Sequence, residues 1–185
     1  MEKQFLDLFA ACFDKDLDPL LGEAVLLCLE VEKEKREMVV TIRPNALLEK
    51  QMLFAAEQAI AQALSLSKCR IAVKYTPDRF TPDYLPQIAA DLKRSVSVIN
   101  GYFTDAAGTY ENKTLTIHLK HGGLELLERC NVRGHVAALI EQEFSFRPEV
   151  RFDGVTVIDQ DAYYAETPDI PFYEAVPLPN EAPPE

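Results

Sequence analysis

The clearest alternation of apolar and polar residues lies between residues 113 and 120. Leu115, Ile117 and Leu119 alternate there with polar residues, which is typical of a strand with one buried face. The elements expected after it are helices over 122–130 and 132–145, the second capped by Asn131, and a strand over 147–153. We expect the two strands to pair in one sheet, with both helices against a face of it.

The first part of the chain shows a similar mixture of helical and strand periods. The elements expected there are a helix over 4–13, a hairpin of strands over 24–43, a helix over roughly 46–64 that opens at Pro44, and a strand from Cys69 to Tyr75. Within the first strand, Val25, Leu27, Leu29 and Val31 are expected to share one face.

Between these two parts, two prolines in residues 76–83 indicate a linker. Thr81 followed by Pro82 and Asp83 is also typical of a helix start, and a helix to about Arg94 is expected. A second short helix over 95–103 and a loop over 105–112 are expected to complete this segment.

These elements predict an α+β chain of two small α/β modules. The first spans residues 1–76 in the order α-β-β-α-β, and the second spans 81–158 in the order α-α-β-α-α-β. Residues 159–185 contain six prolines and no Lys or Arg. Such an acidic, Pro-rich segment is expected to be a disordered linker, because it buries too little apolar surface to offset its ordering entropy.

Composition limits the classes of partner and compartment. The 185 residues carry a net charge of −11, which argues against a nucleic-acid-binding surface over the whole chain but leaves a local basic patch open. Four widely spaced cysteines without a CxxC pair are typical of a reduced setting, so we expect a cytoplasmic protein. No apolar run approaches the length of a membrane span, and the polar start is not a signal peptide.

Four stretches carry a resemblance to a known family. They are the strand Val39-Val-Thr-Ile-Arg43, the long helix after Pro44, the strand from Ile71 to Tyr75, and the strand Asn112-Lys-Thr-Leu-Thr-Ile-His118 with its two following helices. Over residues 4–153 this order resembles the N-terminal region of PolC-type DNA polymerase III alpha subunits. The resemblance implies two small N-terminal domains, the second KH-like, in a longer DNA-directed DNA polymerase with 3′–5′ exonuclease activity.

The function that this resemblance implies is a non-catalytic protein-interaction region that takes part in replisome assembly and DNA replication. Its implied partners are replisome proteins, with the tau clamp-loader subunit as a candidate. An alternative is a KH-like module that binds single-stranded nucleic acid, and a third is a purely structural cap. The sequence departs from the nucleic-acid-binding alternative at one point. The segment Cys130-Asn-Val-Arg-Gly-His135 lacks the GxxG loop of nucleic-acid-binding KH domains.

No residue is assigned a catalytic, cofactor-binding or metal-binding role from the sequence, and no polymerase or exonuclease activity is expected of this chain by itself. His118, His121, Cys130 and His135 are of types that bind zinc, but their spacing matches no usual finger pattern. Asp14, Asp16 and Asp18 lack the glycine and the final Glu of an EF-hand loop, so a solvated turn is expected. The basic residues weighed as a nucleic-acid patch, and interpreted as scattered surface charge, are Lys68, Arg70, Lys74, Lys93, Arg94, Arg129 and Arg133.

Overall fold

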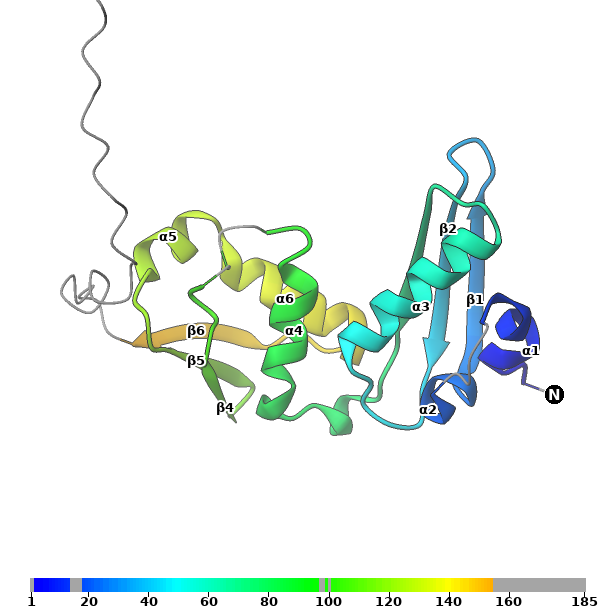
Figure 1. Cartoon of the computed structure of the whole chain (residues 1–185). Coiled ribbons are helices and arrows are strands. Elements are labelled where there is room, and N and C mark those ends of the chain that lie inside the picture. The colour runs from blue at the N-terminus through cyan, green and yellow to red at the C-terminus, as the bar shows by residue number, and fades with distance from the viewer. Residues whose placement is uncertain (1, 14–17, 97–98, 100, 155–185) are drawn as a thin grey trace, which may run out of the picture.

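The chain forms two modules that lie side by side, each built on a three-stranded sheet (Figure 1). The computed structural model describes residues 2–13, 18–96, 99 and 101–154. We use "first module" for the described residues up to 76 and "second module" for those from 81 onwards. The expected α+β class is confirmed, whereas the expected tail lies outside the described residues.

The first module contains a hairpin, a crossover helix and a third strand, preceded by short helices. Its elements are α1 (Phe5–Phe9), η1 (Ala10–Cys12), α2 (Pro19–Gly22), β1 (Val25–Glu32), β2 (Glu37–Arg43), α3 (Lys50–Ala63) and β3 (Lys68–Val73). β1 and β2 pair antiparallel, and β2 and β3 pair parallel through α3. The expected order is confirmed, with α2 as an addition, and α3 begins later than Pro44, with Glu49 at its N-cap.

The expectation for the faces of β1 is wrong. Val25 lies opposite Arg43, whereas Leu29 lies opposite the buried Val40, because the pairing register shifts between Leu26 and Cys28. An extra residue of this kind reverses the side to which the following residues point. Val25 and Leu29 therefore lie on opposite faces of the sheet.

The second module repeats this plan with a helix pair as the crossover. Its elements, after η2 (Pro77–Arg79), are η3 (Pro82–Tyr84), α4 (Leu85–Leu92), β4 (Ala107–Glu111), β5 (Thr114–Leu119), α5 (Leu124–Arg129), α6 (Val132–Phe144) and β6 (Glu149–Gly154). β4 and β5 pair antiparallel, and β5 and β6 pair parallel. Leu115, Ile117 and Leu119 are buried, so the expected sheet and its buried face are confirmed.

One expectation about the start of this module is wrong, and a second falls partly outside the described residues. The segment expected as a loop over 105–112 contains β4, which is joined to β5 by a turn with Asn112 at φ 49° and Lys113 at φ 65°. Positive φ at both central residues is the geometry of a two-residue hairpin turn that matches sheet twist. Of the helix expected over 95–103, the described residues form turns and a 3₁₀ position, and residues 97, 98 and 100 lie outside the description.

Helix capping also differs from the expectation. Asn131 stands at the N-cap of α6, but its φ is 51° and its side chain makes no capping hydrogen bond. Thr81 at the start of η3 makes none either. The N-cap residue normally has an extended backbone, which Asn131 lacks. Thr81 has that backbone and still makes no capping hydrogen bond, so position and backbone together do not ensure a cap.

Candidate functional site

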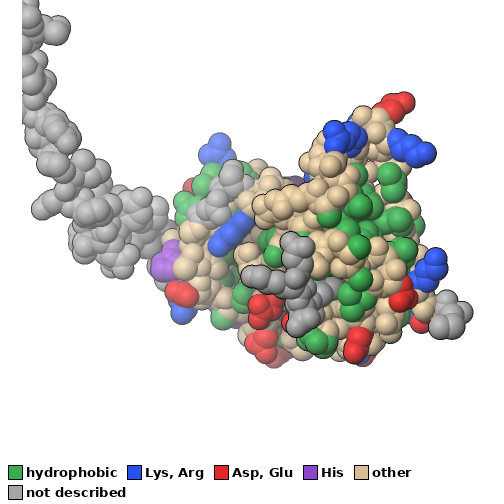
Figure 2. Space-filling model, turned by 45° about the vertical axis from the view of Figure 1, so that its right-hand side comes forward, with side chains coloured by type: hydrophobic (Ala, Val, Ile, Leu, Met, Phe, Trp, Pro, Cys, Tyr) green, Lys and Arg blue, Asp and Glu red, His purple; other side chains and the backbone are tan. Residues whose placement is uncertain are grey.

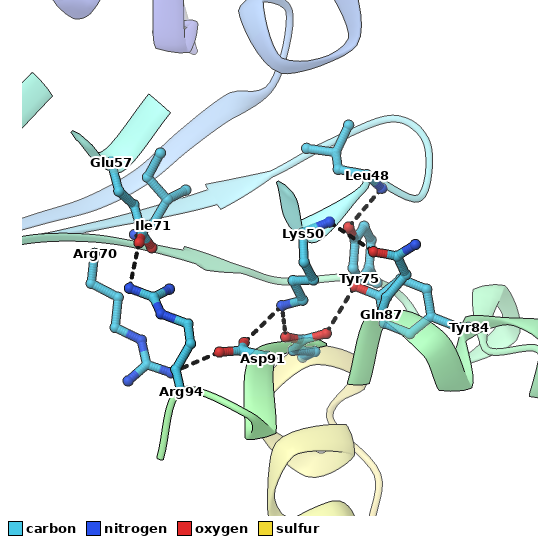
Figure 3. Close-up of polar contacts among 11 residues, drawn as sticks. Leu48, Lys50, Glu57, Arg70, Ile71, Tyr75, Tyr84, Gln87, Asp91 and Arg94 are labelled. Carbon is cyan, nitrogen blue, oxygen red and sulfur yellow. Dashed lines mark hydrogen bonds and ion pairs between the residues drawn. The ribbon is translucent and has the colours of Figure 1, made fainter. Parts of the chain in front are cut away.

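A buried ionic cluster lies where the two modules meet. Lys50, the first residue of α3, is 2% exposed. Its ammonium lies 3.0 Å from Asp91 Oδ2 on α4 and pairs more closely with Glu143 Oε1 on α6 (Figure 3). A buried charge of this kind is tolerated only when opposite charges surround it, so the cluster fixes three helices relative to one another.

Glu143 connects this cluster to a group of aromatic side chains. The Tyr84 hydroxyl donates to Glu143 Oε2 at 3.1 Å, and the Tyr75 amide donates to the Glu143 carbonyl at 2.6 Å. Tyr75 in turn accepts a hydrogen bond from the Leu48 amide at 3.0 Å, and its ring lies 5.0 Å from that of Phe144. The junction is therefore held by hydrophobic packing and by hydrogen bonds that satisfy its buried polar groups.

The pKa values at the junction follow from burial and from the facing charges. Burial alone lowers the pKa of Lys50, but the carboxylates of Glu143 and Asp91 outweigh it, so the pKa is raised and the ammonium is kept. Burial raises the pKa of Glu143 against the attraction of Lys50. Burial, followed by the negative charge of Glu143, raises the pKa of Tyr84, which keeps its hydroxyl a hydrogen-bond donor.

A second buried carboxylate covers the outer edge of β3. Glu57 on α3 accepts a hydrogen bond from the Ile71 amide at 2.8 Å, and Arg94 lies 2.8 Å from its other oxygen. The Arg94 guanidinium also stacks over the ring of Phe54 at 4.2 Å. The Glu57 carboxylate thus accepts a hydrogen bond from an amide at the sheet edge that would otherwise be free to pair with another strand.

A cavity of about 240 Å³ opens beside this junction. Arg70 of β3 and Lys74, which directly follows β3, lie in its wall, and the second module supplies Asp91, Leu139 and Gln142. Asp91 is already paired with Lys50, and the Lys74 ammonium donates to the Gln142 carbonyl. The wall carries the cations of Lys50, Arg70 and Lys74 together with the carboxylates of Asp91 and Glu143, so its charge is mixed and selects weakly for a ligand of one sign.

The opposite edge of the same sheet is formed by β1 and is largely uncovered. The amide of Leu26 donates to the Lys3 carbonyl at 2.8 Å, so the arm before α1 covers the start of β1. Beyond that point Leu27, Leu29 and Val31 are 44%, 43% and 51% exposed. Figure 2 shows hydrophobic side chains gathered on this side of the molecule, below the charged tip of the hairpin. Exposed apolar side chains in a group are typical of surfaces that contact another protein.

The residues weighed as a zinc set do not come together. His118 on β5 lies 3.1 Å from Asp153 on β6 and 3.2 Å from the Thr109 hydroxyl on β4, which is a cross-strand contact. Cys130 is an exposed thiol at the end of α5. Among the described residues, no group of three or more His, Cys, Asp or Glu side chains is placed to hold a metal ion.

The acidic and basic residues weighed from the sequence have local roles. Asp18 caps α2 by accepting from the Leu20 amide at 2.8 Å, while Asp14 and Asp16 lie outside the described residues. Arg94 pairs with Glu57, and Arg133 pairs with Glu128.

Sequence reasoning missed the ionic cluster, although a signal was present. The stripe of α3 that faces the core comprises Lys50, Leu53, Glu57 and Ile60, which recur at helical spacing. A charged residue in such a stripe indicates a buried ion pair, because it cannot reach solvent without turning the apolar residues outwards. The partner helices could not be identified in this way, since pairing depends on how the modules pack.

Comparisons with known proteins do not assign the chain to a family. Among the described residues, no helix is both long and apolar enough to cross a membrane. No protein-family model, curated protein or solved structure matches the sequence or the structure.

Proposed function

We propose that this chain is a non-catalytic protein-interaction region at the start of a cytoplasmic replicative DNA polymerase of the PolC type, where it contributes to replisome assembly. The observation that carries the proposal is the row of exposed apolar side chains on β1. Other exposed large apolar residues, such as Leu8 on α1 and Leu64 after α3, are spread over several elements, whereas these three lie on one strand, so the row stands out as a docking surface. Replisome proteins are the partners, with the tau clamp-loader subunit as the candidate to test first.

We further propose that the second module is KH-like. The hairpin of β4 and β5 and the final strand β6 form one mixed three-stranded sheet, and the chain order is helix, hairpin, helix pair and strand. This arrangement supports the assignment. The link between α5 and α6 is only Cys130 and Asn131, and Gly134 lies within α6. A KH domain clamps nucleic acid with a GxxG loop at this link, so the arrangement favours protein contact.

The nucleic-acid alternative receives less support from the surface. Binding of a single strand uses a basic groove together with aromatic rings on which bases stack. Tyr75, Phe80 and Tyr84 are buried in the core. Arg94 and Arg133 already pair with glutamates. These groups are therefore committed to the fold.

The proposal is tested by capture of purified replisome proteins on immobilised chain, using residues 1–158 and 1–185 in parallel. We expect one replisome protein to bind both forms and to be released by Leu29→Lys, because a charge on β1 disrupts an apolar contact. Single-stranded DNA is applied to the same immobilised chain at low salt as the alternative ligand. Retention of DNA but of no replisome protein contradicts the proposal and favours the nucleic-acid alternative.

A further inference from the structure

The backbone of β1 presents hydrogen-bonding groups to solvent along its outer edge. The Lys74 amide donates to the Ile42 carbonyl at 2.8 Å, so Ile42 faces β3, and by alternation so does Val40. Leu29 lies opposite Val40 in the antiparallel register, in a pair without mutual hydrogen bonds. Leu29 therefore directs its N–H and C=O away from β2, and the same argument applies to Val31.

The side chains of this edge define what an added strand has to contain. Leu29 and Val31 lie on the face of the sheet that carries the buried Val40 and Met38, so an added strand meets apolar surface there. Glu30 points to the other face and is exposed, and no ion pair to it is found among the described residues. An apolar–basic–apolar alternation is the complement of this edge, because the basic residue faces Glu30.

We propose that the outer edge of β1, residues 27–32, binds an extended partner segment by strand addition, and that this segment alternates apolar residues with Lys or Arg. The inference rests on the proposed function as a docking region and names its site and the chemistry of its partner. Main-chain hydrogen bonds supply the affinity in this mode of recognition, and alternate side chains supply the specificity. The arm at Lys3–Phe5 already adds to the first residues of β1 in the same way, through the bridge between Gln4 and Val25.

Charge distinguishes this partner from a second copy of the chain. The chain has a net charge of −11, so two copies repel one another. The pairing that centres β1 on Glu30 places two glutamates directly opposite each other, which is destabilising. A basic segment is attracted by the same charges.

The test uses the whole 185-residue chain as bait for a display library of random peptides of about twelve residues, long enough to hold one strand. We expect the enriched peptides to alternate apolar residues with Lys or Arg. Leu29→Pro should weaken them about tenfold or more, because proline removes an outward N–H and obstructs the added strand. Proline is tolerated on an edge strand when its nitrogen faces solvent, and Val31→Lys provides a second variant if Leu29→Pro does not fold.

The charge requirement is tested separately with Glu30→Lys. This variant should bind the same peptides several-fold more weakly and should reduce the effect of salt on binding. Amide shifts confined to residues 27–32 on adding a peptide would support the site. The inference is overturned if enriched peptides bind Leu29→Pro and Val31→Lys as well as the unmodified chain, or if none is enriched over empty support. It is also overturned if the only ligand is a second copy, detected as a dimer by sedimentation.

The two proposals fail in different ways. If peptides bind at β1 but no replisome protein is captured, the strand-addition site is supported and the proposed replisome function is contradicted. A replisome protein that binds Leu29→Pro unchanged would keep the proposed function and place its site elsewhere.

Discussion

The two sheets of this chain have the same topology, but their first strands differ in how far neighbouring residues cover them. In each sheet the first two strands pair antiparallel, and the third returns parallel after a helical crossover. β4 is short, and Pro82 of η3 packs against it at Gly108. β1 is longer, and its apolar residues Leu27, Leu29 and Val31 are exposed.

This difference shows that topology does not decide whether an edge is protected. Proteins usually cover an edge strand, shorten it or place charges on it, because its free amides can pair with other chains. β4 follows this rule, and so does β3, whose outer amides are bonded by Glu57 and by Glu143. β1 departs from the rule, and we infer that the exception is functional.

The largest expected effect concerns the covered side of the first sheet. Lys50→Met removes the cation that lies between the buried Glu143 and the half-buried Asp91, and it leaves the Glu143 carboxylate without a cation beside it. We expect the free energy of unfolding at neutral pH to fall by about 3–5 kcal/mol, as measured by urea denaturation. The matched control is Lys35→Met, whose pair with Glu32 is exposed and should contribute less than about 1 kcal/mol. Equal losses in the two variants would show that the junction does not depend on its buried charge.

The next effect compares the central strand of the second sheet with the outer strand of the first. Ile117 in β5 is fully buried, and we expect Ile117→Ala to lower the free energy of unfolding by about 2–5 kcal/mol. Leu29 in β1 is 43% exposed, so Leu29→Ala should cost about 1 kcal/mol or less. Urea denaturation of both variants measures the difference. A loss at Leu29 as large as that at Ile117 would mean that β1 is covered in solution.

The smallest effect concerns pH and distinguishes buried from exposed thiols. Burial raises the pKa of Cys69 from 9.0 to about 11, so its stabilising contribution is full below pH 9.0 and is lost as the pH rises through about 11. The raised pKa values of Lys50 and Tyr84 act in the same direction as the pH rises above the ordinary values of 10.5 and 10.0. Urea midpoints between pH 8 and pH 11 should therefore fall.

Two alanine variants separate the contribution of Cys69 from the others. Cys69→Ala should reduce the fall in the midpoint between pH 9 and pH 11, whereas Cys28→Ala, which removes an exposed thiol, should leave it unchanged. An identical fall in both variants would exclude Cys69 as a cause.

Local pattern predicted most of the secondary structure because the period of apolar residues follows from backbone geometry. The hairpin, the crossover helices and the buried face of β5 were all predicted in this way. β4 was missed because its sequence, Ala-Gly-Thr-Tyr-Glu, is too short and too polar to show a clear period, although Asn112 at its turn was a usable signal.

The pattern of apolar and polar residues was enough to establish the α+β class and the order of the main elements, and it also contained the charged residues within apolar stripes. Which stripes meet depends on how the modules pack, since the contact of Lys50 with Glu143 joins residues 93 positions apart. The register shift at Leu27 was likewise decided by pairing with β2, because a bulge reverses the faces of a strand without changing its composition. That shift, together with the absence of a covering element over residues 27–32 in the described part of the chain, is what leaves β1 open.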